Sequence, residues 1–304
     1  MTVASSSTNP LLALEMKTTH RSEWGQIWRR FRNNRLAVIG LVVVFVLILV
    51  ALFAPVLAPY DPTFNERGMR GALPSWLHWL GSDYNGRDLL SRIIFGTRIA
   101  LMVGLGATFL QVIIGFIIGA IAGFFGGWTD TVLSRFIDVL MAVPVLALLL
   151  LLASILGDKK LPSVLLTILV IGFTGWARFA RVIRADILSL KTSDYVLAAR
   201  ASGVANARII FRHMLPNVLG PIIVLASLGI GSIIILESAL SFLGLGVRPP
   251  MPSWGIILSD GRQYLEYYPH IAISPGVMIV LTVLAFNFVG DGLRDALDPK
   301  QPVK

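Results

Sequence analysis

The chain has 304 residues, of which 55% are hydrophobic and 14% are charged, and it contains no cysteine. Its mean hydropathy of +0.76 lies well above that of a soluble globular domain and indicates a membrane protein. The absence of cysteine excludes disulfide frameworks, thiol catalysis and cysteine-ligated clusters. The net charge of +9 arises from Lys and Arg residues that flank the hydrophobic runs. Such a distribution favours membrane insertion and contact with lipid, so we expect no nucleic-acid partner.

The N-terminal third begins with a polar tail over residues 1–36. Aromatic residues alternate with arginines between Trp24 and Arg35, which predicts an interfacial helix at the membrane surface. An uncharged run follows and predicts a first transmembrane helix over 37–58. This run is too long for the hydrophobic region of a cleaved signal peptide, so we expect a retained anchor. Residues 59–96 then form a segment outside the membrane.

Five further apolar runs lie within residues 97–293, which we expect to form the core, and a polar tail follows over 294–304. About 20 helical residues cross a hydrocarbon core, and lipid offers no partner for an unpaired backbone. The sequence therefore predicts an all-α membrane protein with six transmembrane helices, the remaining five at about 99–125, 137–157, 163–185, 218–243 and 270–290. Glycines at 115, 119, 123 and 127 share one helical face and predict close helix packing.

The distribution of basic residues predicts the orientation. Of the 26 Lys and Arg residues, 17 lie in segments on the side of the two termini and 9 lie on the opposite side. Because basic residues are retained on the inner side, we expect both termini in the cytoplasm.

A polar stretch, residues 193–217, separates the fourth and fifth apolar runs and reads SDYVLAARASGVANARIIFRHMLPN. Ser193 and Asp194 suit a helix N-terminus, and Gly203 is a natural helix stop in left-handed geometry. A second helix is expected from about Asn206 to Met214, with Pro216 interrupting it or starting the next span. The small residues of the first helix suit close docking against another protein, although an ordinary amphipathic loop helix is the alternative.

Polar residues inside the apolar runs are candidates for a hydrated pathway, because polar groups are costly in lipid. Glu237 is the strongest candidate, and Gln111 and Asn287 are weaker ones. Interhelical pairing is the alternative for all three. No paired-His metal spacing, GxSxG motif or GxxxxGK[ST] phosphate loop occurs in the sequence, so we expect neither a metal site nor catalytic residues, and any ATPase must be a separate chain.

The 193–217 stretch resembles the EAA loop of ABC-importer permeases, whose pattern is Glu-Ala-Ala, three residues, Gly, nine residues, Ile, one residue, Leu-Pro. Two positions depart from it: Leu197 replaces the Glu, and His213 replaces the Ile. The missing Glu would remove a salt bridge with the ATPase, for which apolar docking by Leu197 is a substitute. The resemblance implies an ATPase-coupling loop at Leu197, Ala198, Ala199, Arg200, Gly203, His213, Leu215 and Pro216.

Other blocks extend the resemblance over nearly the whole chain beyond residue 22. These include RRFRNNRLAVIGLVVV, HWLGSDYNGRDLLSRIIFGTRIAL, ESALSFLGLGVRPPMPSWG and LAFNFVGDGLRDALDPK. They are similar to the C-type permease subunit of dipeptide/oligopeptide ABC importers. This resemblance implies the type I importer permease fold and a location in a bacterial inner membrane. The implied partners are a B-type permease, two cytoplasmic ATPases that bind ATP and Mg, and an extracytoplasmic binding protein.

The resemblance implies import of di- or oligopeptides, with a nickel chelate, an opine or another small solute as alternatives. A second class, a self-contained channel or secondary carrier, would need several buried carboxylates for an ion relay, and only Glu237 lies deep in an apolar run. A third class, a membrane enzyme, would need clustered catalytic residues, which the sequence does not show.

Overall fold

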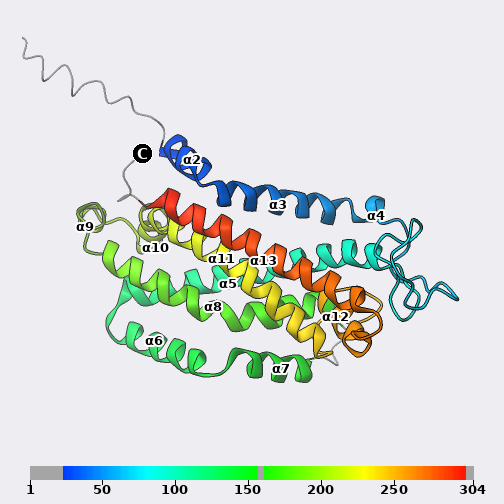
Figure 1. The fold of residues 1–304 in the computed structure, drawn as a ribbon. Helices are drawn as coiled ribbons and strands as arrows, with labels where there is room; N and C mark the ends of the chain where they lie inside the picture. Colours follow the sequence, from blue (N-terminus) through cyan, green and yellow to red (C-terminus); the bar gives the residue numbers. More distant parts are fainter. Residues whose placement is uncertain (1–22, 157–160, 299–304) are drawn as a thin grey trace, which may run out of the picture.

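The computed structural model describes residues 23–156 and 161–298, and every regular element within these ranges is a helix. The long helices lie side by side in an elongated bundle (Figure 1). One end, which we call the terminal end, carries α2 and the C-terminal part of α13, joined where Arg30 Nη1 donates to the Asp298 carbonyl at 2.9 Å. The other end, the distal end, carries the segment between α4 and α5 together with α12.

The first span is shorter than the predicted 37–58. An interfacial stretch, α2 (Glu23–Asn33), leads into α3 (Arg35–Leu52), and the Asn34 side chain caps α3 by accepting from the Ala37 amide at 3.2 Å. The chain then turns at Phe53 into the short helix α4 (Ala54–Leu57). A proline in the first turn of α4 suits a helix start and cannot continue the hydrogen bonds of α3.

The second span begins ten residues before the predicted start at 99. Helix α5 (Leu89–Phe125) has 37 residues and a length of about 55 Å, so it extends beyond a hydrocarbon core of about 30 Å. The Asp88 side chain caps it by accepting from the Ser91 amide at 2.7 Å. Arg92 and Arg98, which precede the apolar run in the sequence, thus lie in the first turns of one continuous helix, at its distal end.

The third span is broken, whereas the sequence predicted one helix over 137–157. Helix α6 (Gly127–Ala142) and helix α7 (Val145–Leu156) meet at an angle of 88°. Pro144 lacks an amide hydrogen and disfavours helical geometry at Val143, which is extended at φ −80° and ψ 130°. Residue 157 lies outside the described residues.

The later spans extend further than the sequence predicted. Helices α8 (Ser163–Leu190), α11 (Leu215–Phe242) and α13 (Pro269–Leu297) replace the predicted ranges 163–185, 218–243 and 270–290. Helix α12 (Trp254–Gly261) and a short 3-10 turn, η2 (Arg262–Tyr264), connect α11 to α13 at the distal end. Five of the described helices are long and apolar enough to cross a membrane, and counting the bent α6–α7 pair as one broken span brings the number to six.

Helices α5 and α8 share the most extensive contact among the described helices. A Cβ added at Gly115 or Gly119 of α5 would lie 2.5 Å from an atom of α8, and one at Gly123 would lie 2.9 Å away. The predicted small-residue face therefore packs backbone against backbone, as in membrane helix pairs generally. Gly127 does not belong to this face, because α5 ends at Phe125.

Candidate functional site

The 193–217 segment forms a short helix, α9 (Asp194–Ala201), beyond the terminal end of α8. Gly203 follows the helix with φ +74°. Its amide donates to the Arg200 carbonyl at 3.0 Å, and the Val204 amide donates to the Ala199 carbonyl at 3.1 Å. These two bonds form a Schellman motif, so the predicted left-handed stop at Gly203 is confirmed.

The N-terminus of α9 differs from the expectation in the role of the Ser193 hydroxyl. Ser193 occupies the cap position with extended backbone, but its side chain makes no capping bond. Its hydroxyl donates instead to the Leu190 carbonyl at 2.6 Å, which fixes the turn between α8 and α9. Asp194 lies in the first turn of α9, where its charge complements the helix dipole.

Helix α9 has one buried face and one exposed face. Val196 is fully buried in an apolar cluster with Phe124 of α5 and Ile187 of α8, and Ala199 packs at its edge. Leu197 is 48% exposed, and Ala198 is exposed beside it. The structure therefore holds α9 firmly against the bundle and presents a surface of small and apolar side chains away from it.

Arg200 makes a contact that sequence reasoning missed. Its guanidinium carbon lies 4.9 Å from the centroid of the Phe124 ring at the end of α5. This cation–π contact ties α9 to α5 in addition to the buried Val196. No local pattern indicates it, because Phe124 and Arg200 belong to different helices.

The remainder of the segment leads into α11 without a break. Helix α10 (Asn206–Arg208) continues as a π-helical stretch, η1 (Ile209–Met214), and the Leu215 amide donates to the Ile210 carbonyl. Pro216 lies in the first turn of α11, where the π-helical stretch changes to α-helix, so it does not interrupt the continuous helix over Asn206–Phe242. The carbonyl of half-buried His213 accepts from the Asn217 side chain at 2.7 Å, which satisfies one backbone group near the proline.

A cavity of about 390 Å³ lies between α5, the α6–α7 bend, α8 and α11. Gln111 lines it, and its Nε2 donates to the Ile171 carbonyl at 2.9 Å. Sequence reasoning missed the other polar residues of its wall, which come from α8 and α11: Thr174, Arg178 and Ser232. The Val143–Pro144 bend also lines the cavity, so proline in an apolar run was the available signal.

Glu237 and Asn287 do not line this cavity. Glu237 is fully buried in α11, and its carboxylate accepts from the Ser241 hydroxyl at 2.7 Å. Asn287 lies on α13 on the side of Gly231 of α11, with its Oδ1 3.6 Å from a Cβ added there. Of the three predicted pathway residues, the structure thus brings only Gln111 to the cavity, while the other two lie at helix contacts.

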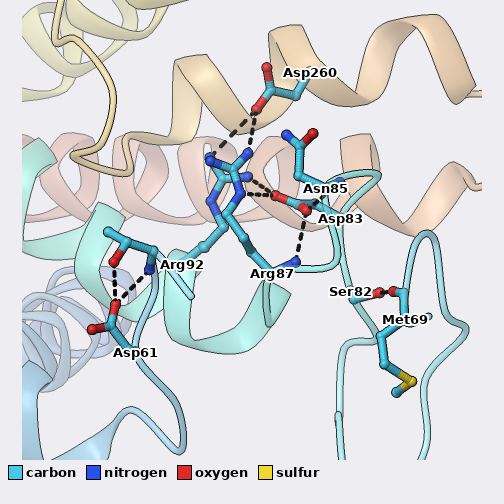
Figure 2. A network of polar contacts seen from close by, with 9 residues as sticks. Asp61, Met69, Ser82, Asp83, Asn85, Arg87, Arg92 and Asp260 are labelled. Carbon is cyan, nitrogen blue, oxygen red and sulfur yellow. Dashed lines mark hydrogen bonds and ion pairs between the residues drawn. The ribbon is translucent and has the colours of Figure 1, made fainter. Parts of the chain in front are cut away.

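The distal end is held by a cluster of two arginines and two aspartates (Figure 2). Arg92 of α5 is 2% exposed and pairs with Asp83, which is 1% exposed, and with Asp260 of α12 at 3.5 Å. Arg87 Nε lies 2.7 Å from Asp83, and its Nη2 lies 3.2 Å from Asp260. The cluster has no formal net charge and joins the segment before α5 to α12.

Comparisons with known proteins agree with this arrangement. A family model described as the binding-protein-dependent transport system inner membrane component matches residues 115–301. A second model, the N-terminal transmembrane domain of oligopeptide transport permease C, matches residues 22–74. The chain belongs to the family of binding-protein-dependent transport system inner membrane components.

Curated relatives cover nearly the whole chain. The dipeptide transport system permease DppC of Alkalihalophilus pseudofirmus is 42% identical over 94% of this chain and 93% of its own length. The oligopeptide permease OppC of Bacillus subtilis is 42% identical over 92% and 90%, and the glutathione permease GsiD of Pectobacterium atrosepticum is 42% identical over 92% of both chains.

A solved structure of the MetNI methionine ABC transporter in an inward-facing conformation contains a chain with a similar fold. The TM-score is 0.55 at 18% sequence identity, over 69% of this chain and 98% of that chain. This likeness confirms the predicted all-α, type I importer permease fold.

Proposed function

We propose that this chain is a permease subunit of an ATP-driven importer that moves di- or oligopeptides across a bacterial inner membrane. The observation that carries the proposal is α9, which is anchored in the bundle by Val196 and Arg200 yet exposes Leu197 and Ala198. Such a surface suits the cleft of a separate ATPase, on which ATP and Mg bind. The terminal end is then the cytoplasmic end, as the basic residues also indicate.

In this proposal the cavity is one half of the translocation pathway. Its wall combines apolar side chains from the α6–α7 bend with polar groups at Gln111, Thr174 and Arg178. A B-type permease would complete the pathway, and the distal segments would face an extracytoplasmic binding protein that delivers the peptide.

Closure of the ATPase pair would displace α9 and move α8 and α11 with it. Helix α8 carries Thr174 and Arg178 in the cavity wall and ends one short turn before α9. ATP can drive transport only if the two conformations of the permease bind the ATPases with different affinities. The contacts that fix α9 to the bundle would then couple a change at the ATPases to a change at the cavity.

A bulky substitution on α9 tests the coupling role. Ala198→Trp, in the complete importer reconstituted in proteoliposomes, should lower ATP-dependent peptide uptake at least about tenfold, as expected when an indole blocks a close-packed interface. The matched control is Ala185→Trp, at an exposed alanine of α8 outside the segment, and it should retain uptake. Normal uptake and normal substrate-stimulated ATP hydrolysis in Ala198→Trp would exclude the proposed role of α9.

The substrate class needs a separate test. Mass spectrometry of the ligand that copurifies with the cognate binding protein should detect peptides. Detection of a nickel chelate or an opine without peptide would replace the proposed substrate but leave the coupling role untouched.

A further inference from the structure

A second hollow, the α3–α5 groove, lies on the bundle near the distal end and has a volume of about 290 Å³. Its walls come from Ile48 and Leu52 of α3 and from Arg98, Met102 and Leu105 of α5. Helix α3 runs toward the distal end and α5 runs away from it. Arg98 and Leu52 therefore mark the distal mouth of the groove, and Ile48 and Leu105 mark its deeper end.

Arg98 is the one charged residue of this groove. It shares a helical face with Met102 and Leu105, because these residues follow it by four and seven positions. Its side chain is exposed, and no hydrogen bond or ion pair joins it to any of the residues that the structure describes. Arg92, six positions earlier, is instead satisfied by Asp83 and Asp260. A guanidinium on an apolar surface thus makes no ion pair with the described residues, and an anion beside it would reduce the cost of placing this charge near lipid.

The groove lies at the depth where a lipid phosphate is available. Helix α3 has 18 residues and a length of about 27 Å, close to the thickness of the hydrocarbon core. Leu52 is its last residue and is 67% exposed, so the mouth of the groove lies near the boundary between acyl chains and headgroups. The long side chain of Arg98 can extend from there to the headgroups while its methylenes cover apolar surface.

The groove also lies away from the cavity. Helix α3 and the α6–α7 pair lie on opposite sides of the bundle (Figure 1). A second permease that completes the pathway would approach the α6–α7 side, so the α3–α5 groove would stay open to lipid in such an assembly.

We propose that the α3–α5 groove binds a phospholipid of the leaflet at the distal end. The phosphodiester pairs with the Arg98 guanidinium, whose planar donors match phosphate oxygens. One acyl chain lies along Ile48, Met102 and Leu105. The lipid then bridges α3 to α5 on the side where these helices leave a gap.

Photolabelling of the complete importer in nanodiscs tests this site. The nanodiscs contain phosphatidylethanolamine and phosphatidylglycerol, with a small fraction of phosphatidylglycerol that carries a diazirine in one acyl chain. Peptide mass spectrometry after irradiation should show labels concentrated at 48–52 and 101–105, well above those on the lipid-facing side of α13 at 277–284. Equal labelling of the two regions in the wild-type protein would overturn the proposal without any variant.

Substitutions then test the role of the charge. Arg98→Gln should lower labelling of the groove at least about fivefold, because a charge-assisted phosphate contact is lost. Arg98→Lys should retain part of it, and Leu105→Trp should displace the label from the deep end while the charge remains. The matched control is Arg135→Gln, at an exposed arginine of α6, which should leave groove labelling unchanged.

Two outcomes would contradict the assignment to a lipid. Displacement of the label by excess inorganic phosphate would indicate a site for free phosphate. Cross-links from the groove to a polypeptide, or unchanged labelling in Arg98→Gln, would show that another occupant fills the groove.

Discussion

At the scale of single residues, Gly203 decides where α9 ends. Its φ of +74° costs an L-residue roughly 1–2 kcal/mol, and nothing lies within 4 Å of an added Cβ. Gly203→Val should therefore act through backbone strain alone and lower peptide uptake several-fold by misplacing α9, with normal membrane insertion. Gly203→Asn is the control, because asparagine tolerates left-handed geometry and should keep most of the uptake. Equal uptake by the two variants would show that the geometry at this residue is unimportant.

Gly175, in the cavity wall, leaves space for the side chain of Gln111. A Cβ there would lie 2.1 Å from the Gln111 Nε2, so the amide must move and lose its bond to the Ile171 carbonyl. Gly175→Ala should lower the free energy of unfolding by about 1–3 kcal/mol, the cost of an unsatisfied buried group. Gly229→Ala is the matched control, since it lines the same cavity but its Cβ would meet only Phe179 at 3.7 Å. The melting temperatures of the two purified complexes should differ clearly; coinciding values would mean that Gln111 moves without cost.

At the scale of elements, the arginine–aspartate cluster holds the distal segments together. Asp83 is buried and meets both arginines, so Asp83→Asn should cost about 3–5 kcal/mol of stability. Asp260 is 39% exposed, and solvent screening should reduce the cost of Asp260→Asn to about 1 kcal/mol or less. Limited proteolysis of the segment before α5 should accelerate far more in Asp83→Asn. Similar rates for both variants would contradict this ranking.

Local patterns in the sequence were sufficient for features whose cause is local. The Schellman stop at Gly203 and the glycine face of α5 at Gly115, Gly119 and Gly123 depend on backbone geometry or on spacing along one helix, and the structure shows both. The long apolar runs likewise indicated five of the six predicted spans, although not their ends, and the sixth corresponds to the bent α6–α7 pair.

Features that depend on distant residues were not predictable in this way. Arg87 and Asp260 are 173 positions apart, so nothing in either local sequence indicates their ion pair. The cavity likewise combines Gln111 with Thr174, Arg178 and Ser232 of other helices, so no local pattern marks it out. The break at Pro144 was readable in principle, but composition alone made 137–157 resemble one continuous span.

At the scale of the whole molecule, three parts lie in order along the bundle. The exposed surface of α9 is at the terminal end, the cavity lies at the α6–α7 bend, and the arginine–aspartate cluster closes the distal end. Helices α5 and α8 link these parts and pack closely against each other at Gly115 and Gly119. In the proposed mechanism, a displacement of α9 reaches the cavity through this closely packed pair.

Cross-linking at α9 tests the central claim most directly. The chain contains no cysteine, so Leu197→Cys introduces a single thiol that can carry a benzophenone. In the complete importer, irradiation should join this chain to an ATPase subunit, and ATP should change the yield. The same label at Trp79→Cys, a 69% exposed position at the distal end, should give no ATPase adduct. An ATPase adduct from Trp79→Cys and none from Leu197→Cys would contradict both the orientation and the coupling role of α9.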